Sequence, residues 1–307
     1  MVFVYSHSDC RDHVTPPGHP ERVERLLAID AALKQGGVSV LDCPLGEEAD
    51  VLRCHPPAYL ARVKSAVPRQ GWARMDGDTF LSPGSYLAAM RAVGGACAAV
   101  DTVMGQGGRA FVAVRPPGHH AERETAMGFC LFGTAAIAAK RALEVHGLTR
   151  VAVLDFDVHH GNGTQDLLWD EARVRCVSSH QMPLYPGTGT RREVGAHGQI
   201  TNLPLAAGSD GAAMRAAWGP ILADLRDWGP ELVVVSAGFD AHEDDPLAGL
   251  NWQDEDFAWI TSAICDLADS ACAGRVVSCL EGGYDLQALA ACVAVHVSEL
   301  GKVRDER

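Results

Sequence analysis

The densest group of residues that can do chemistry is the run DFDVHH at 155–160. Asp157 and His159 are two positions apart, and an extended segment projects such residues to the same side. A carboxylate and an imidazole projecting together form half of a metal site. Catalytic zinc takes three protein ligands and leaves a fourth position for water. Asp240, at the end of another predicted strand, is the natural third ligand, and the spacing leaves the identity of the metal open.

Two adjacent histidines, His119 and His120, follow a Pro-Pro-Gly turn that stiffens the loop and fixes where the rings point. Adjacent histidines on a surface usually have no role, but these follow a predicted buried strand. Asp155 and Asn162 lie where each can accept a hydrogen bond from one imidazole Nδ1. Such bonds set the tautomer and the basicity of the ring.

Tyr284 closes the glycine-rich run EGGY at 281–284. The glycines allow a loop that presents the phenol, and a phenol can donate to a developing oxyanion. This run alone is a weak signal, because such a sequence is more often a plain turn.

The elements that must position these groups alternate along the chain. Short apolar runs without two-residue alternation predict strands buried on both faces, at 110–114, 151–154, 174–177, 232–235 and 276–280. Helix-like segments alternate with them, at 20–35, 83–104, 134–145, 210–226, 254–271 and 286–300. Together they predict a mostly parallel α/β sheet covered on both faces. Ligands bind beyond the carboxyl ends of such strands, so the polar clusters that follow the five strands are expected to converge.

Composition sets broad limits on the function. The net charge of -13 argues against a nucleic-acid-binding surface, and the ten cysteines include no CxxC pair, as in a reducing compartment. The N-terminus lacks the basic start and apolar stretch of a secretory signal. No run approaches the roughly 20 apolar residues of a membrane span. We therefore expect a cytoplasmic protein without a membrane or nucleic-acid partner, and the oligomeric state stays open.

Motifs along nearly the whole chain resemble the zinc-dependent histone deacetylase superfamily, and within it the bacterial members closest to the class II enzymes. The matching segments occur in family order: GHPERVERL at 18–26, RPPGHHA at 115–121, GFCLF at 128–132, DFDVHHGNGTQ at 155–165, PLYPGTG at 183–189, SAGFDAHEDDPLAGL at 236–250 and LEGGYDL at 280–286.

The resemblance implies a single catalytic domain over residues 1–307 with the arginase-like α/β fold and an eight-stranded, mostly parallel sheet. It implies one zinc ion on Asp157, His159 and Asp240. It also implies acid/base roles for His119 and His120 and a carbonyl-polarising role for Tyr284. The family's structural potassium ion would be bound by Asp155, Asp157, His159, Ser178 and Ser179. The implied reaction is hydrolysis of an acylated amine.

Substrate choice is indicated by residues at the expected tunnel. Gly128, Phe129 and Tyr185 match positions that wall the narrow acyl-lysine tunnel, and Asp78 in a rim loop can hold a substrate amide. Leu247 falls where polyamine-specific relatives carry a glutamate that pairs with the substrate ammonium. Acetyl-lysine, or another short acyl-lysine, is therefore favoured, with acetylpolyamines or other small N-acyl amines as the alternative.

Three other hypotheses are less consistent with the sequence. An arginase-like two-metal ureohydrolase needs further carboxylates to bridge the second metal, and the adjacent histidines and EGGY have no role in it. A non-catalytic protein that binds acyl ligands is expected to have lost Tyr284 or a histidine, and all are present. An α/β protein without a metal is tested by zinc analysis. Asn162 is the class II residue, and Gly133 replaces an asparagine common after GFCLF, with an effect that the sequence does not reveal.

Overall fold

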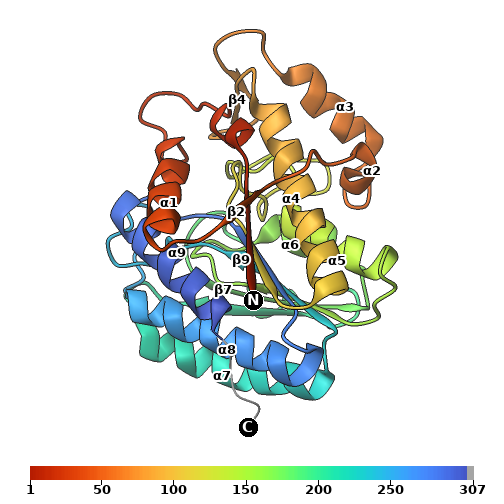
Figure 1. Ribbon diagram of the computed structural model, residues 1–307, viewed down its shortest axis with the longest axis vertical. Coiled ribbons are helices and arrows are strands. Elements are labelled where there is room, and N and C mark those ends of the chain that lie inside the picture. Colours follow the sequence, from red (N-terminus) through yellow and green to blue (C-terminus); the bar gives the residue numbers. More distant parts are fainter. Residues whose placement is uncertain (303–307) are drawn as a thin grey trace.

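The computed structural model describes residues 1–302, so residues 303–307 of the predicted domain lie outside the described part. An eight-stranded sheet forms its centre, in the order β2-β1-β5-β10-β9-β6-β7-β8, with every pair of neighbouring strands parallel (Figure 1). The strands are β1 Val2–Ser6, β2 Val40–Asp42, β5 Arg109–Val112, β6 Val151–Asp155, β7 Val174–Gln181, β8 Ile200–Leu205, β9 Leu232–Ala237 and β10 Val276–Leu280. A small antiparallel hairpin joins β3 Ala73–Arg74 to β4 Phe80–Leu81.

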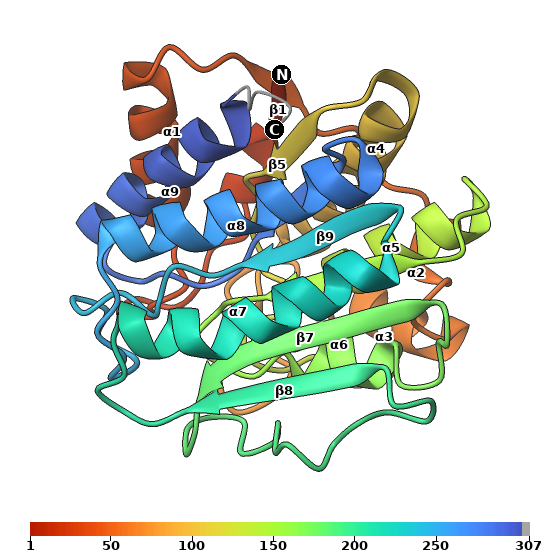
Figure 2. The ribbon, with the colours of Figure 1, turned by 90° about the horizontal axis from the view of Figure 1, so that it is seen from below.

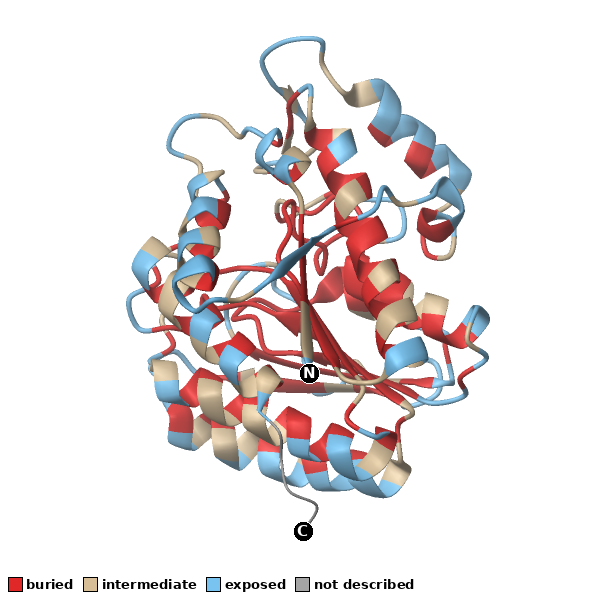
Figure 3. Cartoon of the chain, in the orientation of Figure 1, coloured by how far each residue is buried: buried red, intermediate tan, exposed pale blue. Residues whose placement is uncertain are grey.

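Helices cover both faces of the sheet, as expected for parallel strands. Along one face α1, α9, α8 and α7 lie side by side, and α4 and α5 pack together on the other (Figure 2). The helices are α1 Glu24–Gln35, α2 Glu48–Val51, α3 Pro57–Ala66, α4 Ser85–Gln106, α5 Thr134–Glu144, α6 Asn162–Leu167, α7 Gly211–Trp228, α8 Asp254–Cys272 and α9 Leu286–Gly301. The central strands β5, β6, β9 and β10 are buried along their whole length (Figure 3).

All five predicted strands are present, and so are all six predicted helices, but α1 begins at Glu24 rather than at 20. The backbone before it is held by tertiary contacts: Thr15 donates to the Glu21 carbonyl, and the Glu21 carboxylate binds Arg115. Helix α8 starts at Asp254 as predicted, and its N-cap Gln253 forms a capping box with Asp256. The sequence analysis did not predict β1, β2 or β8, since β2 is short and exposed and β8 contains a proline.

Helix α4 has the length and apolar composition of a membrane span, which the sequence analysis did not recognise. The share of its most apolar window that is buried inside the protein is 67%. It packs against α5 and β5, so it is a core helix in this fold. All ten cysteines are free and buried, as the absence of paired motifs predicts.

Candidate active site

The polar clusters singled out in the sequence follow five strands that are consecutive in the sheet, β5-β10-β9-β6-β7. Because all of these strands are parallel, the segments after them meet at one edge of the sheet. The adjacent histidines come after β5, Tyr284 after β10, Asp240 after β9 and the DFDVHH run from the end of β6. The structure therefore brings the predicted residues together.

Asp157, His159 and Asp240 form a compact buried cluster. The Nδ1 atom of His159 lies 3.1 Å from Asp157 Oδ1 and 3.1 Å from Asp240 Oδ2. One candidate ligand atom from each of the three residues lies within 4.8 Å of the others. Two carboxylates and one imidazole nitrogen around a common point are a ligand set that suits zinc.

The electrostatics of this cluster favour a cation. Burial lowers the pKa of His159, but its hydrogen bonds to Asp157 and Asp240 outweigh burial and raise that pKa to about 10. The ring proton thus supplies positive charge between two buried carboxylates, which need a positive partner. Gly282 leaves room for them, since a Cβ there would lie 2.1 Å from Asp240 Oδ2 and 2.6 Å from Asp157 Oδ2. The residues present fit a divalent metal ion.

The local geometry of the Asp-x-His pair differs from the prediction. Strand β6 ends at Asp155, so Asp157 and His159 lie in a bend and not in an extended segment. They meet because Asp157 Oδ1 accepts the backbone N–H of His159 over 2.8 Å. The Asp155 carboxylate makes the same contact to the N–H of Asp157 over 3.0 Å. Successive side chain-to-backbone turns, rather than strand pleating, aim these groups.

His119 is held between two acidic residues. Its Nδ1 atom lies 3.0 Å from Asp155 Oδ2, and its Nε2 atom lies 3.8 Å from Asp157 Oδ1. Burial lowers the pKa of His119, but the charges of Asp157 and Asp155 outweigh burial and hold the pKa well above its usual value. This histidine therefore favours the protonated form.

His120 has the opposite character. Its Nδ1 atom lies 2.7 Å from Asn162 Oδ1, and the Asn162 amide nitrogen donates to Glu122. Because the amide oxygen must then face the ring, the His120 proton sits on Nδ1 and the Nε2 lone pair is free to accept. Burial, together with the charges of His119 and His159, lowers the pKa of His120 well below its usual value. The adjacent histidines thus divide into a proton carrier and a neutral base.

Tyr284 is a protonated phenol at the same edge. Burial raises its pKa well above the usual value, and the charge of Asp240 raises it further. Its backbone N–H donates to Asp245 Oδ2 over 2.7 Å. Arg25, a fully buried residue of α1, donates to the carbonyls of Gly283 and Glu281 over 2.6 and 2.5 Å. The loop is therefore fixed from two sides.

Aromatic rings stand beside these groups. The Phe129 ring lies 5.8 Å from that of Tyr284, and the Tyr185 ring lies 5.2 Å from that of His120. Gly128 has a φ of 54°, and a Cβ there would lie 2.4 Å from the His120 ring. This close approach needs glycine, and it sets Phe129 in place.

The predicted rim residues are less buried. Asp78 lies in the β3–β4 hairpin. Burial is the main cause of the raised pKa of Tyr185, and the charge of Asp78 raises that pKa further. Leu247 is half-buried, and its N–H donates to Asp245. Within the acidic run 243–245, Asp245 is buried, whereas Glu243 and Asp244 are exposed.

Gly133, whose effect the sequence left open, is the N-cap of α5, and its N–H donates to His55 Nε2 over 3.0 Å. A Cβ at this position would lie 2.3 Å from the end of the Leu167 side chain. Gly133 therefore serves local packing away from the reacting groups.

The predicted potassium ligands come from adjacent strands. Asp155 on β6 pairs in register with Ser178 on β7, and both line a cavity of about 10 Å³. The buried hydroxyl of Ser179 has no hydrogen-bond partner among residues 1–302. A buried hydroxyl without a partner is available to a ligand such as a cation.

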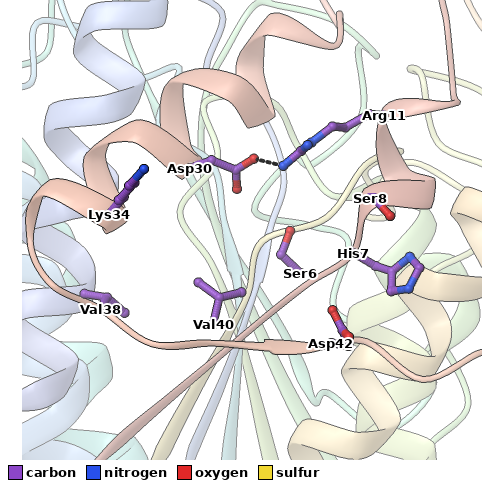
Figure 4. A pocket seen from close by; sticks show the side chains of 9 residues that line it. All are labelled: Ser6, His7, Ser8, Arg11, Asp30, Lys34, Val38, Val40 and Asp42. Carbon is purple, nitrogen blue, oxygen red and sulfur yellow. Dashed lines mark hydrogen bonds and ion pairs between the residues drawn. The ribbon is translucent and has the colours of Figure 1, made fainter.

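A larger hollow lies elsewhere in the fold. An open pocket of about 460 Å³ lies between α1, β1 and β2, and an ion pair of Arg11 and Asp30 spans it (Figure 4). Its lining residues are Ser6, His7, Ser8, Arg11, Asp30, Lys34, Val38, Val40 and Asp42. None of the predicted site residues contributes to it, so cavity size alone does not locate the chemistry in this protein.

Sequence reasoning missed three residues that support the site. Glu281 accepts from the N–H groups of Gly118 and His119 over 2.7 and 3.1 Å and thereby fixes the histidine loop. Arg25 and Asp245 fix the loop of Tyr284. All three belong to quoted motifs, LEGGYDL, GHPERVERL and SAGFDAHEDDPLAGL, but only their buried contacts reveal their role.

A parallel α/β sheet with carboxylates, three imidazoles and a phenol at one edge is the arrangement of a hydrolase of the deacetylase class. The chain belongs to the histone deacetylase family, because residues 19–300 match the histone deacetylase domain. It is 42% identical over 95% of its length to the uncharacterized protein slr0245 of Synechocystis, covering 97% of that protein. It is 37% identical over 95% of its length to the histone deacetylase-like amidohydrolase of Pseudomonas aeruginosa, covering 80% of it. The HDA15 HD domain crystal structure matches with a TM-score of 0.92 at 30% identity, over 97% of this chain and 88% of that one.

Proposed function

We propose that this deacetylase-family chain is a zinc-dependent hydrolase that removes acetyl or other short acyl groups from the ε-amine of lysine. The observation that carries the proposal is the convergence of three features. These are the cation-fitting cluster of Asp157, His159 and Asp240, the free Nε2 of His120 and the protonated phenol of Tyr284. A potassium ion on Asp155, Ser178 and Ser179 is part of the same proposal.

Zinc held by the cluster would supply a Lewis acid that polarises the amide carbonyl and acidifies water. Three residues of the chain would move the protons and stabilise the charge that develops. His120 takes a proton from water through Nε2, as its depressed pKa allows. Tyr284 donates a hydrogen bond to the carbonyl oxygen as negative charge develops there. His119, which holds its proton beside Asp155, stabilises this charge and is the nearest donor for the departing amine.

Rings on two sides of the cluster support a slender substrate. Phe129 and Tyr185, beside Tyr284 and His120, would flank an alkyl chain that leads from a reacting amide to solvent, as an acyl-lysine side chain requires. The half-buried, apolar Leu247 offers no charge to a second ammonium, which supports lysine over a polyamine. The two-metal ureohydrolase is not supported, because Glu281 accepts from the N–H groups of the histidine loop, and because His120 and Tyr284 have no role in that reaction.

The proposal is tested by zinc analysis of the purified protein and by kcat/KM for acetyl-lysine peptides, longer acyl-lysines and N-acetylated diamines. We expect at least one zinc per chain and a preference for the acyl-lysine peptides. A protein without zinc would refute the metal, and a preference of about tenfold or more for the diamines, about 1.4 kcal/mol, would reassign the substrate.

A further inference from the structure

Outside the site described above, His242, Asp254 and Cys292 form a second group of potential metal ligands. His242 lies in the loop between β9 and α8, Asp254 is the first residue of α8, and Cys292 lies on α9. Helices α8 and α9 pack side by side (Figure 2), and this packing brings the three residues together. One candidate ligand atom from each lies within 4.8 Å of the others.

The distances match those between ligands of a tetrahedral ion. His242 Nε2 lies 3.6 Å from Asp254 Oδ1, and Cys292 Sγ lies 3.3 Å from the same oxygen. Zinc bonds of about 2.0 Å to nitrogen or oxygen and about 2.3 Å to sulfur place neighbouring ligands about 3.3–3.5 Å apart. Two of the three separations therefore match those around one tetrahedral ion, and the third, between His242 and Cys292, is within 4.8 Å.

The imidazole is buried and its Nε2 atom has no hydrogen bond. The His242 side chain is 8% exposed, and within residues 1–302 the nearest charged partner of Nε2 is the Asp254 oxygen. The ring is oriented from its other side, where Nδ1 accepts the N–H of Asp244 over 3.1 Å, and it stacks on Phe257. A ring nitrogen that faces a carboxylate oxygen beyond hydrogen-bond distance is placed to share an ion with that oxygen.

We propose that His242, Asp254 and Cys292 form a second metal site, for a soft or borderline divalent cation such as Zn²⁺. Thiolate, imidazole and carboxylate together favour such an ion over Mg²⁺ or Ca²⁺. Binding releases the thiol proton of Cys292 to solvent. The ring proton moves to Nδ1, where the Asp244 carboxylate lies 3.8 Å away and replaces the N–H contact.

An ion can reach the site, and the charges around it attract one. The Asp254 side chain is 48% exposed, whereas Cys292 is buried. Glu243 and Asp244 are exposed beside it, and the first turn of α8 carries Asp254, Glu255 and Asp256. These carboxylates outweigh the positive end of the helix dipole.

The site would tie together the segments on which the catalytic loop depends. Its histidine lies two residues after Asp240 and three before Asp245, which holds the backbone of Tyr284. Cys292 lies on the helix that begins directly after this tyrosine. An occupied site would therefore stiffen the loop and raise Tm, because an ion that binds only the folded chain stabilises it.

Cobalt(II) substitution of the whole protein tests the site independently of the proposed reaction. The cluster of Asp157, His159 and Asp240 contains no sulfur, so a thiolate-to-cobalt charge-transfer band in the near ultraviolet reports only the second site. We expect this band in the unmodified protein. We expect it to be lost in Cys292→Ser and in Asp254→Asn, a change of an exposed side chain that should not disturb folding.

Cys272→Ser, at the opposite end of α8 from Asp254, is the matched control and should keep the band. Zinc analysis should give one equivalent fewer in Cys292→Ser than in this control. Added Zn²⁺ should raise the Tm of Cys272→Ser by more than it raises the Tm of Cys292→Ser. A protein without the band, or a band that persists in both Cys292→Ser and Asp254→Asn, would overturn the proposal and leave a hydrogen-bonded cluster. Either result would leave the assignment of the first metal cluster unaffected.

Discussion

Arg25 holds Tyr284 from behind: its guanidinium carbon lies 5.0 Å from the centre of the tyrosine ring. The same guanidinium donates to two carbonyls of the loop, those of Gly283 and Glu281, and pairs with Glu21. The phenol therefore takes its position from a buried cation on α1, at the other end of the chain.

Arg25→Lys should lower kcat with little change in KM. A lysine ammonium keeps the charge but lacks the planar fork that serves two carbonyls at once, so the loop of Tyr284 loosens. Each buried carbonyl left without a donor costs about 1–3 kcal/mol, which urea unfolding should detect. Steady-state kinetics decide the role: an unchanged kcat in a destabilised protein would make Arg25 purely structural.

Tyr284→Phe should reduce kcat by about 10²–10³, the usual effect of removing one oxyanion donor. The ring keeps its contacts with Phe129 and Arg25, so zinc content and thermal unfolding should stay close to those of the unmodified protein. Single-turnover kinetics with an acetyl-lysine peptide measure the effect. Undiminished turnover would show that the phenol does not stabilise the oxyanion.

Asn162→Asp should shift the acid limb of the pH profile of kcat/KM to higher pH. His120 acts as a base only when neutral, and its pKa is held well below the usual value by burial and the neighbouring histidines. A carboxylate in place of the amide favours the imidazolium and raises the pKa. Activity should then fall at a pH where the unmodified protein is still fully active. An acid limb that does not move would mean that another group controls it.

Asp240→Asn should remove one equivalent of bound zinc while leaving the fold intact. The neutral amide is a poor ligand, and it leaves Asp157 and His159 as half of a site. Metal analysis after dialysis, with circular dichroism as the check on folding, measures the change. Glu243→Gln, at an exposed position in the same loop, is the control and should keep its metal. Full zinc occupancy in Asp240→Asn would exclude Asp240 as a ligand.

Leu247→Glu should shift the substrate preference toward N-acetylated diamines by about tenfold or more, equivalent to about 1.4 kcal/mol. The introduced carboxylate can pair with the free ammonium of a diamine, whereas an acyl-lysine peptide offers no such partner. Leu247→Gln, of similar size and without charge, separates the electrostatic effect from the loss of apolar surface. Equal preferences in the two variants would show that this position does not read the substrate charge.

Much of the site was predictable because its residues lie next to strands. A parallel sheet places the carboxyl ends of its strands at one edge, so the locations of His119, Asp157, Asp240 and Tyr284 followed from recognising the strands that precede them. The family was predicted from the motifs and from their order along the chain. Edge strands were harder to recognise, because β2 is exposed and carries no buried run.

Only the tertiary structure decided how these groups are held and charged. Arg25 is 258 positions from Gly283, and His242, Asp254 and Cys292 come from three separate elements. The burial of Asp245 was also decided by the tertiary structure, because a run of three acidic residues does not indicate that one of them is buried. Sequence determines which groups follow each strand, since the apolar run that forms a strand is a local feature. Burial, hydrogen-bond partners and the resulting pKa shifts depend on packing between distant segments, and they give His119 and His120 opposite protonation states.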